Sequence, residues 1–144
     1  MLLDLKVKYH VEGLEKIKKF DQGAWIDLRS AYDYEIKKGN FQLIDLGISV
    51  KIPEGYEMSL KPRSSTFKNW GIMQTNSVGT IDEPYSGEQD IVKMPVYATR
   101  DTVIKKNDRV CQFRLDRTMP KLRIIEVLSM IDASRGGFGS TGVN

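Results

Sequence analysis

The sequence predicts an all-β domain followed by a glycine-rich C-terminal arm. Three observations support this fold class. Apolar and polar residues alternate with a period of two in several short runs, as in half-buried strands, and turn residues separate these runs. A length of 144 residues with 40% hydrophobic content suits one domain with a core. Short strands joined by turns are typical of a β-barrel or β-sandwich.

The chain opens with a predicted strand. Residues 3–9 alternate between apolar and polar side chains. Residues 14–19 are too short for a convincing helix and lie between Gly13 and Gly23, so we interpret them as a connection. The N-terminal part therefore contributes one strand and a loop.

The middle of the chain predicts a bulge and a tight turn. Between Phe41 and Ile52 the alternation changes phase once, near Asp45, which indicates a β-bulge or a turn between strands. Residues 53–56 then place proline and glycine where a tight reversal needs them. Because alternation resumes at residues 56–60, we expect a β-hairpin across this turn.

Three further strands are predicted, at residues 91–98, 109–115 and 122–128. After Asp132 the composition changes to glycine, serine and threonine, with almost no core-forming side chains. We therefore divide the chain into a β domain of residues 1–131 and an arm of residues 132–144. The arm should stay mobile until something orders it.

Composition narrows the possible functions. Cys111 is the one cysteine, so it cannot form an intramolecular disulfide, and one histidine (His10) with one cysteine cannot supply three or four zinc ligands. The first residues match neither a signal peptide nor a membrane span. These features indicate a soluble protein in a reducing, intracellular setting.

The charge pattern does not favour a polymeric partner. A net charge of +3 would suit a phosphate-bearing ligand, but the basic residues are interleaved with nineteen acids. Residues 16–20 alone combine clustered lysines with an aromatic residue, and a solvated surface explains them better. We expect neither a nucleic acid nor a membrane as partner.

Residues 76–88 carry the strongest functional signal. They place the Asn76 amide, the Asp82 carboxylate and the Tyr85 phenol around a turn at Gly79. These are the parts of a nucleotide pocket with its own base. On local sequence alone, a turn with an ordinary Asn, Asp and Tyr remains an alternative.

Five segments in the same order resemble the trimeric dUTP pyrophosphatases, the dUTPases. They are residues 30–33, 62–66, 76–88, 107–112 and 135–142. The sequence around residues 25–29 is similar to that of dUTPases from bacilli and their phages, which implies a cytoplasmic protein of a bacterial cell or of a phage-infected host. The resemblance implies a distorted jelly-roll, or β-clip barrel, assembled as a homotrimer with shared active sites.

The resemblance also implies a reaction, the hydrolysis of dUTP to dUMP and pyrophosphate. This reaction would supply dUMP for dTMP synthesis and keep uracil out of DNA. Water is a poor nucleophile at neutral pH, so a base must take its proton during attack on the α-phosphate, and Asp82 occupies the family's base position. Mg²⁺ is the expected cofactor, held by substrate phosphates and waters with no direct protein ligand.

The remaining site residues follow from the same resemblance. Asn76 with nearby main-chain groups can offer uracil a donor and an acceptor, whereas cytosine presents the reversed pattern. Tyr85 would pack under the deoxyribose, and Phe138 would stack on the base. The expected uracil and deoxyribose residues are Asn76, Gly79, Thr80, Ile81, Tyr85 and Phe138.

The triphosphate needs donors along its length. The expected phosphate residues are Arg63, Ser64, Ser65, Gln112, Arg135, Ser140 and Thr141. The arm, which carries the last three, would act as a lid over the pocket of another subunit. It departs from the family pattern, since Arg135 lies two positions nearer Phe138 and Ala133 stands where the family has arginine.

Two alternatives remain open. A dCTP deaminase of the same fold shares the Arg-Ser-Ser segment, although its pattern continues to a second arginine where this chain has Lys68. The chain could also act as a dUTP-sensing binding protein with a regulatory protein partner. The complete arm and the Asp82 segment favour hydrolysis over deamination.

Overall fold

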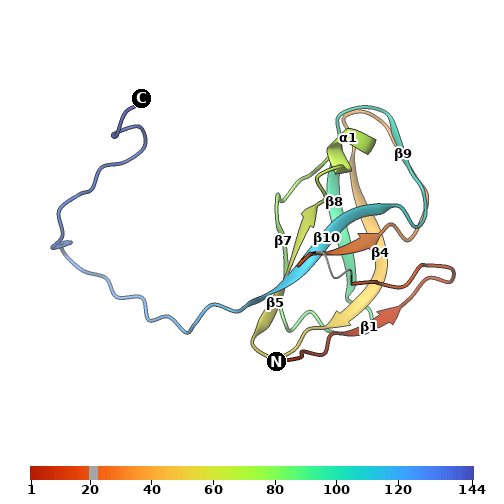
Figure 1. Cartoon of the computed structure of the whole chain (residues 1–144), viewed down its shortest axis with the longest axis horizontal. Helices are drawn as coiled ribbons and strands as arrows, with labels where there is room; N and C mark the ends of the chain where they lie inside the picture. Colours follow the sequence, from red (N-terminus) through yellow and green to blue (C-terminus); the bar gives the residue numbers. More distant parts are fainter. Residues whose placement is uncertain (20–22) are drawn as a thin grey trace.

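A computed structural model describes residues 1–19 and 23–144, so Phe20 of the basic segment 16–20 lies outside the described residues. The described chain forms two four-stranded sheets, one two-stranded sheet and a five-residue helix (Figure 1). Within this part, no helix has the length and apolar composition needed to span a membrane. The predicted all-β fold class is confirmed.

All strand pairs in the described residues are antiparallel. The sheets have the orders β1-β4-β8-β6, β2-β10-β5-β7 and β3-β9. The elements are β1 (Lys6–Tyr9), β2 (Ile26–Arg29), β3 (Tyr34–Ile36), β4 (Phe41–Lys51), β5 (Tyr56–Pro62), α1 (Thr66–Trp70), β6 (Ile72–Gln74), β7 (Gly79–Ile81), β8 (Ile91–Ala98), β9 (Thr102–Ile104) and β10 (Arg109–Arg117).

Both four-stranded sheets contribute to one hydrophobic core. In β8 the alternating residues Val92, Met94, Val96 and Ala98 are buried, as the period of two predicts. The second sheet adds side chains such as that of Phe113, which is 1% exposed. Burying one large apolar side chain contributes about 1.5–3 kcal/mol to the free energy of folding. The core therefore holds the strands, and the loops that join them, in fixed positions.

The bulge predicted near Asp45 is confirmed. β4 is one continuous strand, but its register against β8 shifts between Asp45 and Ser49. Gly47 lies inside the shift at φ +70°, and its N–H donates to Asp45 Oδ1 at 2.6 Å. A Cβ at this position would lie 2.9 Å from the Ala31 Cβ atom, so both the backbone angle and the packing require glycine.

The predicted hairpin across residues 53–56 is wrong, although the turn itself forms. The Tyr56 N–H donates to the Pro53 carbonyl at 3.2 Å, yet β4 and β5 belong to different sheets. β4 is already flanked by β1 and β8, and β5 by β10 and β7. The turn therefore carries the chain from one sheet to the other.

The predicted strand at residues 122–128 is also wrong. β10 ends at Arg117, and the chain beyond it leaves the body as an irregular, exposed segment (Figure 1). Ile124 is 93% exposed and Leu128 fully so. Alternating apolar and polar residues favour a strand, but a strand also needs a neighbouring strand for its backbone N–H and C=O groups. Residues 122–128 have no such neighbour in the described part of the chain.

Candidate active site

Apart from Phe138, which lies in the arm, the residues predicted to bind the base lie on and beside β7. This strand pairs with β5, so that Gly79 lies opposite Leu60 and Ile81 opposite Met58. Asn76 precedes it in an exposed turn from β6, and because β6 and β7 belong to different sheets, this turn is a bridge between sheets and not a hairpin. A Cβ on Gly79 would meet the Leu60 Cβ atom at 3.3 Å, which explains the glycine at this crowded point.

Asp82 follows β7 directly and borders an open cavity of about 530 Å³. The cavity is lined by Thr80, Ile81, Asp82, Pro84, Tyr85, Asp90, Ile91, Val92 and Lys93. Asp82 is exposed, and its carboxylate has no hydrogen-bond or ion-pair partner among residues 1–19 and 23–144. An exposed carboxylate of this kind is free to accept a proton from water.

Tyr85 lies in the same cavity as Asp82. Its hydroxyl donates to the Ile91 carbonyl at 2.9 Å, which fixes the ring. Partial burial, with the nearby Asp90 carboxylate, raises the pKa of Tyr85 above its ordinary value. The phenol is therefore neutral at physiological pH, and its hydroxyl acts as a hydrogen-bond donor to Ile91.

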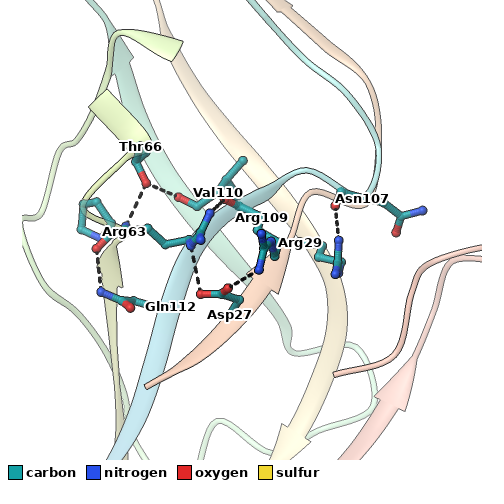
Figure 2. A network of polar contacts seen from close by, with 9 residues as sticks. Asp27, Arg29, Arg63, Thr66, Asn107, Arg109, Val110 and Gln112 are labelled. Atoms are coloured by element: carbon teal, nitrogen blue, oxygen red, sulfur yellow. Dashed lines mark hydrogen bonds and ion pairs between the residues drawn. The ribbon is translucent and has the colours of Figure 1, made fainter. Parts of the chain in front are cut away.

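Arg63 follows β5 in a turn that β10 holds in place. Its N–H donates to Thr66 Oγ1 at 2.8 Å, and the Thr66 hydroxyl donates to the Val110 carbonyl at 2.9 Å (Figure 2). Ser64 and Ser65 lie within this turn, and Ser65 caps α1 without a hydrogen bond from its side chain. Their hydroxyl groups remain available to a ligand.

The Arg63 guanidinium is held by Asp27 of β2. Its Nε atom lies 3.0 Å from Asp27 Oδ1, and a second nitrogen donates to the Arg109 carbonyl at 3.2 Å. The other Asp27 oxygen pairs with the Arg109 guanidinium at 3.2 Å, so one carboxylate lies between two cations (Figure 2). Gln112, opposite Asp27 in the β2–β10 pairing, donates its amide to the Pro62 carbonyl at 3.1 Å.

Sequence reasoning missed Asp27 as a residue of this site. Its carboxylate is 20% exposed and sits beside Arg63, but that proximity depends on β2 and β5 both pairing with β10. The available signal was its position in residues 25–29, which carry part of the family resemblance. Arg109 was missed for the same reason.

One chain does not bring all the predicted residues together. In the β5–β7 pairing Ile81 lies opposite Met58, so Asp82 lies beyond this end of the pairing. Arg63 lies beyond the other end, where Leu60 is opposite Gly79. The two positions are about six residue steps apart along β5, roughly 20 Å. The arm is separate again, since it runs away from the body and Phe138 is fully exposed (Figure 1).

The chain is similar to curated proteins along almost its whole length. A family model described as dUTPase matches residues 17–142. The SPbeta prophage-derived deoxyuridine 5'-triphosphate nucleotidohydrolase of Bacillus subtilis (strain 168) is 52% identical over 140 residues, covering 97% of this chain and 99% of the relative. A deoxyuridine 5'-triphosphate nucleotidohydrolase of Finegoldia magna is 41% identical over 146 residues, covering 96% and 99%.

The fold is also similar to a solved structure. The dUTPase of Staphylococcus bacteriophage 80alpha with dUPNHPP aligns with a TM-score of 0.81 and 21% identity, covering 97% of this chain and 99% of that one. At this level of identity the likeness concerns the fold. The fold described above is thus shared with that phage protein.

Proposed function

The chain belongs to the dUTPase family and is a dUTP diphosphatase, and from this premise we propose that Asp82 is the base of the reaction. The predicted resemblance and the predicted reaction are confirmed by the family match and the relatives. The observation that supports the role of Asp82 is its open carboxylate at the edge of the cavity that also holds Tyr85.

In the proposed mechanism a water molecule attacks the α-phosphorus of dUTP while the Asp82 carboxylate takes one of its protons. The new bond joins the water oxygen to phosphorus, and the bond to the bridging oxygen of the β-phosphate breaks. Pyrophosphate leaves and dUMP remains. An in-line approach of this kind depends mainly on positioning and on charge stabilisation.

Base and sugar recognition is assigned to the residues around β7. We propose that Asn76, with main-chain groups of Gly79, Thr80 and Ile81, pairs with the uracil edge. Tyr85 packs its ring under the deoxyribose, where a ribose hydroxyl would need space. The hydrogen bond from its hydroxyl to Ile91 supports this role because it fixes the ring in one place.

Arg63, Ser64, Ser65 and Gln112 are assigned to the triphosphate. The pairing of Arg63 with Asp27 supports this, since a guanidinium held in one orientation can present its remaining N–H groups to phosphate oxygens. Arg135, Ser140 and Thr141 would add donors from the arm, and Phe138 would cover the uracil. These contacts form only when the arm closes.

The dUTPase family uses Mg²⁺, and we propose that the ion arrives chelated by the triphosphate. Within residues 1–19 and 23–144, no group of three or more His, Cys, Asp or Glu side chains is arranged to hold a metal. Arg63, Ser64 and Gln112 fit such a complex because their donors suit phosphate oxygens. The bound ion would neutralise phosphate charge.

We propose that each active site is completed between copies of the chain in a homotrimer. The separation of Asp82 from Arg63 and the detached arm support this proposal. Exposed apolar side chains also support it. A row across β4, β8 and β6 joins Phe41, Tyr97 and Met73, and more lie in residues 119–131. Apolar surface of this extent is typical of a subunit.

The role of Asp82 is tested by replacing two carboxylates of the same cavity. Asp82→Asn should lower the rate of pyrophosphate release by about 10²–10⁴-fold, because an amide cannot accept the proton. Asp90→Asn is the matched control, since asparagine can still accept the Gly87 N–H that Asp90 binds at 2.8 Å. Wild-type turnover by Asp82→Asn, or equal losses in both variants, would contradict the proposal.

A substrate screen tests the reaction itself. The wild-type protein is supplied with dUTP, dCTP, dTTP and UTP and Mg²⁺, with pyrophosphate and ammonia measured separately. Release of pyrophosphate is expected to be much faster from dUTP than from the other three nucleotides, and in H₂¹⁸O the label should appear in dUMP. Ammonia from dCTP would indicate the deaminase, and equal use of UTP would contradict the role of Tyr85.

A further inference from the structure

Gln74 is a buried polar side chain beneath the turn that carries Asn76. It is the last residue of β6 and is 7% exposed. Its Nε2 atom donates to the Leu60 carbonyl at 3.0 Å and to Asn76 Oδ1 at 2.9 Å. Its Oε1 atom is buried and has no hydrogen-bond partner among the described residues. A buried glutamine with only its amino group in use calls for an explanation.

The two hydrogen bonds determine how both amides are turned. The Leu60 carbonyl can only accept, so Gln74 must turn its amino group toward it. The second hydrogen of the same amino group points at Asn76, which must therefore turn its oxygen inward. The Asn76 amino group, on the opposite branch of the same amide, is therefore turned away from Gln74, and Asn76 lies in an exposed turn.

We propose that Gln74 is a positioning residue that fixes the Asn76 amide with its amino group outward and thereby favours uracil over cytosine. The proposal rests on the assignment of Asn76 to base recognition. Uracil carries a carbonyl oxygen at C4, which accepts a hydrogen bond, whereas cytosine carries an amino group there. An outward-facing amino group on Asn76 matches uracil and opposes cytosine.

The hydrogen bond from Gln74 to the Leu60 carbonyl joins the two four-stranded sheets. Gln74 belongs to the β1-β4-β8-β6 sheet, and Leu60 is in β5 of the other sheet, directly opposite Gly79 of β7. The same amino group thus binds both the Leu60 carbonyl, on the strand beside Gly79, and the Asn76 side chain that is assigned to uracil. A 180° rotation of the Asn76 amide would set two donors against each other, which disfavours the orientation suited to cytosine.

Gln74→Met tests the proposal, because methionine keeps the length of the side chain and suits a buried position but donates no hydrogen bond. We expect the ratio of kcat/KM for dUTP to kcat/KM for dCTP to fall by about fivefold to tenfold, the value of one lost hydrogen bond. The loss should appear in KM for dUTP, with kcat almost unchanged. Equal losses for both substrates, or an unchanged ratio, would overturn the proposal.

Gln42→Met is the matched control. Gln42 and Gln74 both pair with Val96, from opposite sides of β8, but among the described residues the Gln42 amide donates to the Leu43 carbonyl and not to Asn76 or Leu60. This variant should keep the substrate ratio of the wild type. A change as large as that of Gln74→Met would mean that the effect comes from the sheet in general.

A double-mutant cycle with Asn76→Ala shows whether Gln74 acts through Asn76. With Asn76 absent, Gln74→Met should no longer change the ratio, and a persisting effect would overturn the proposal. If Asn76→Ala itself leaves the ratio unchanged, the assignment of Asn76 to base recognition fails. If Asn76→Ala lowers the ratio and Gln74→Met does not, only the role of Gln74 fails.

A measurement on the wild-type protein covers the case in which Gln74→Met does not fold. In NMR spectra of the side-chain amides, both Nε2 protons of Gln74 should exchange slowly with water, because both are donated and buried. Both Nδ2 protons of Asn76 should exchange quickly. Protected Asn76 protons together with a freely exchanging Gln74 would overturn the proposal.

Discussion

Arg63 and Arg135 are both assigned to the triphosphate, but they differ in how the fold holds them. Arg63 is fixed by the Asp27 carboxylate at 3.0 Å and by a hydrogen bond to the Arg109 carbonyl. Arg135 lies in the exposed arm and has no partner among the described residues. In the proposed mechanism, the body therefore positions its phosphate-binding groups during folding, whereas the arm would lose conformational entropy each time it closes.

Removal of the arm should have the largest effect. A chain ending at Ser134 is expected to lose about 10²–10³-fold in kcat/KM for dUTP, because water would enter and the substrate would be poorly positioned. Its melting temperature should match that of the full chain, since the body does not depend on the arm. Removing only Val143 and Asn144 serves as the control. Full activity of the shortened chain would contradict a role of the arm in catalysis. A clear drop in melting temperature would show that the arm stabilises the body.

Asp27→Asn tests whether the body is pre-organised for phosphate. Without the carboxylate, the Arg63 guanidinium is free to move, and KM for dUTP should rise about tenfold. The cost in stability should stay below about 1 kcal/mol, because the pair is partly solvated. Glu15→Gln is the control, since it removes a 3.2 Å ion pair with Arg29. Equal effects of the two variants on KM would argue against a specific role for Asp27.

Phe138→Ala tests a single contact of the arm, the proposed stacking of Phe138 on uracil. Loss of stacking on uracil should raise KM for dUTP about twofold to tenfold and leave the stability of the free protein unchanged. Phe138→Trp should restore most of the affinity, because the stacking surface is kept. A variant that melts at a lower temperature would show that Phe138 packs on the body even without substrate.

Thiol labelling should give the smallest but most direct contrast between the regions. Burial raises the pKa of the Cys111 thiol far above its ordinary value, so the reactive thiolate is scarce at neutral pH and the thiol is also shielded. We expect Cys111 to be labelled only after unfolding, at pH 7 and at pH 9 alike. A cysteine introduced by Ser134→Cys should react at once. Rapid labelling of native Cys111 would contradict the closed core.

The sequence could predict those features that depend on local pattern. The alternation of apolar and polar residues predicted strands β8 and β10. The change in its phase near Asp45 predicted the bulge at Gly47. It could not identify strand partners, because pairing depends on which edges tertiary packing leaves open. For that reason the hairpin at residues 53–56 and the strand at residues 122–128 were predicted wrongly.

The candidate site shows the same limit. Asp82 and Tyr85 follow one another in a short segment, and the structure places both at one cavity. Asp27 pairs with Arg63, and Gln74 donates to the Leu60 carbonyl; both contacts join residues that are distant in sequence and form only after the strands are brought together. A single sequence carries no local sign of such contacts.

Mixing two inactive variants tests most directly whether body and arm act together across copies. The full-length Asp82→Asn chain and a wild-type chain ending at Ser134 are unfolded together, refolded and assayed for pyrophosphate release. If one copy supplies the arm and another the base, random mixing should restore about one quarter of the wild-type rate. No activity beyond that of the separate variants would show that base and arm belong to the same chain.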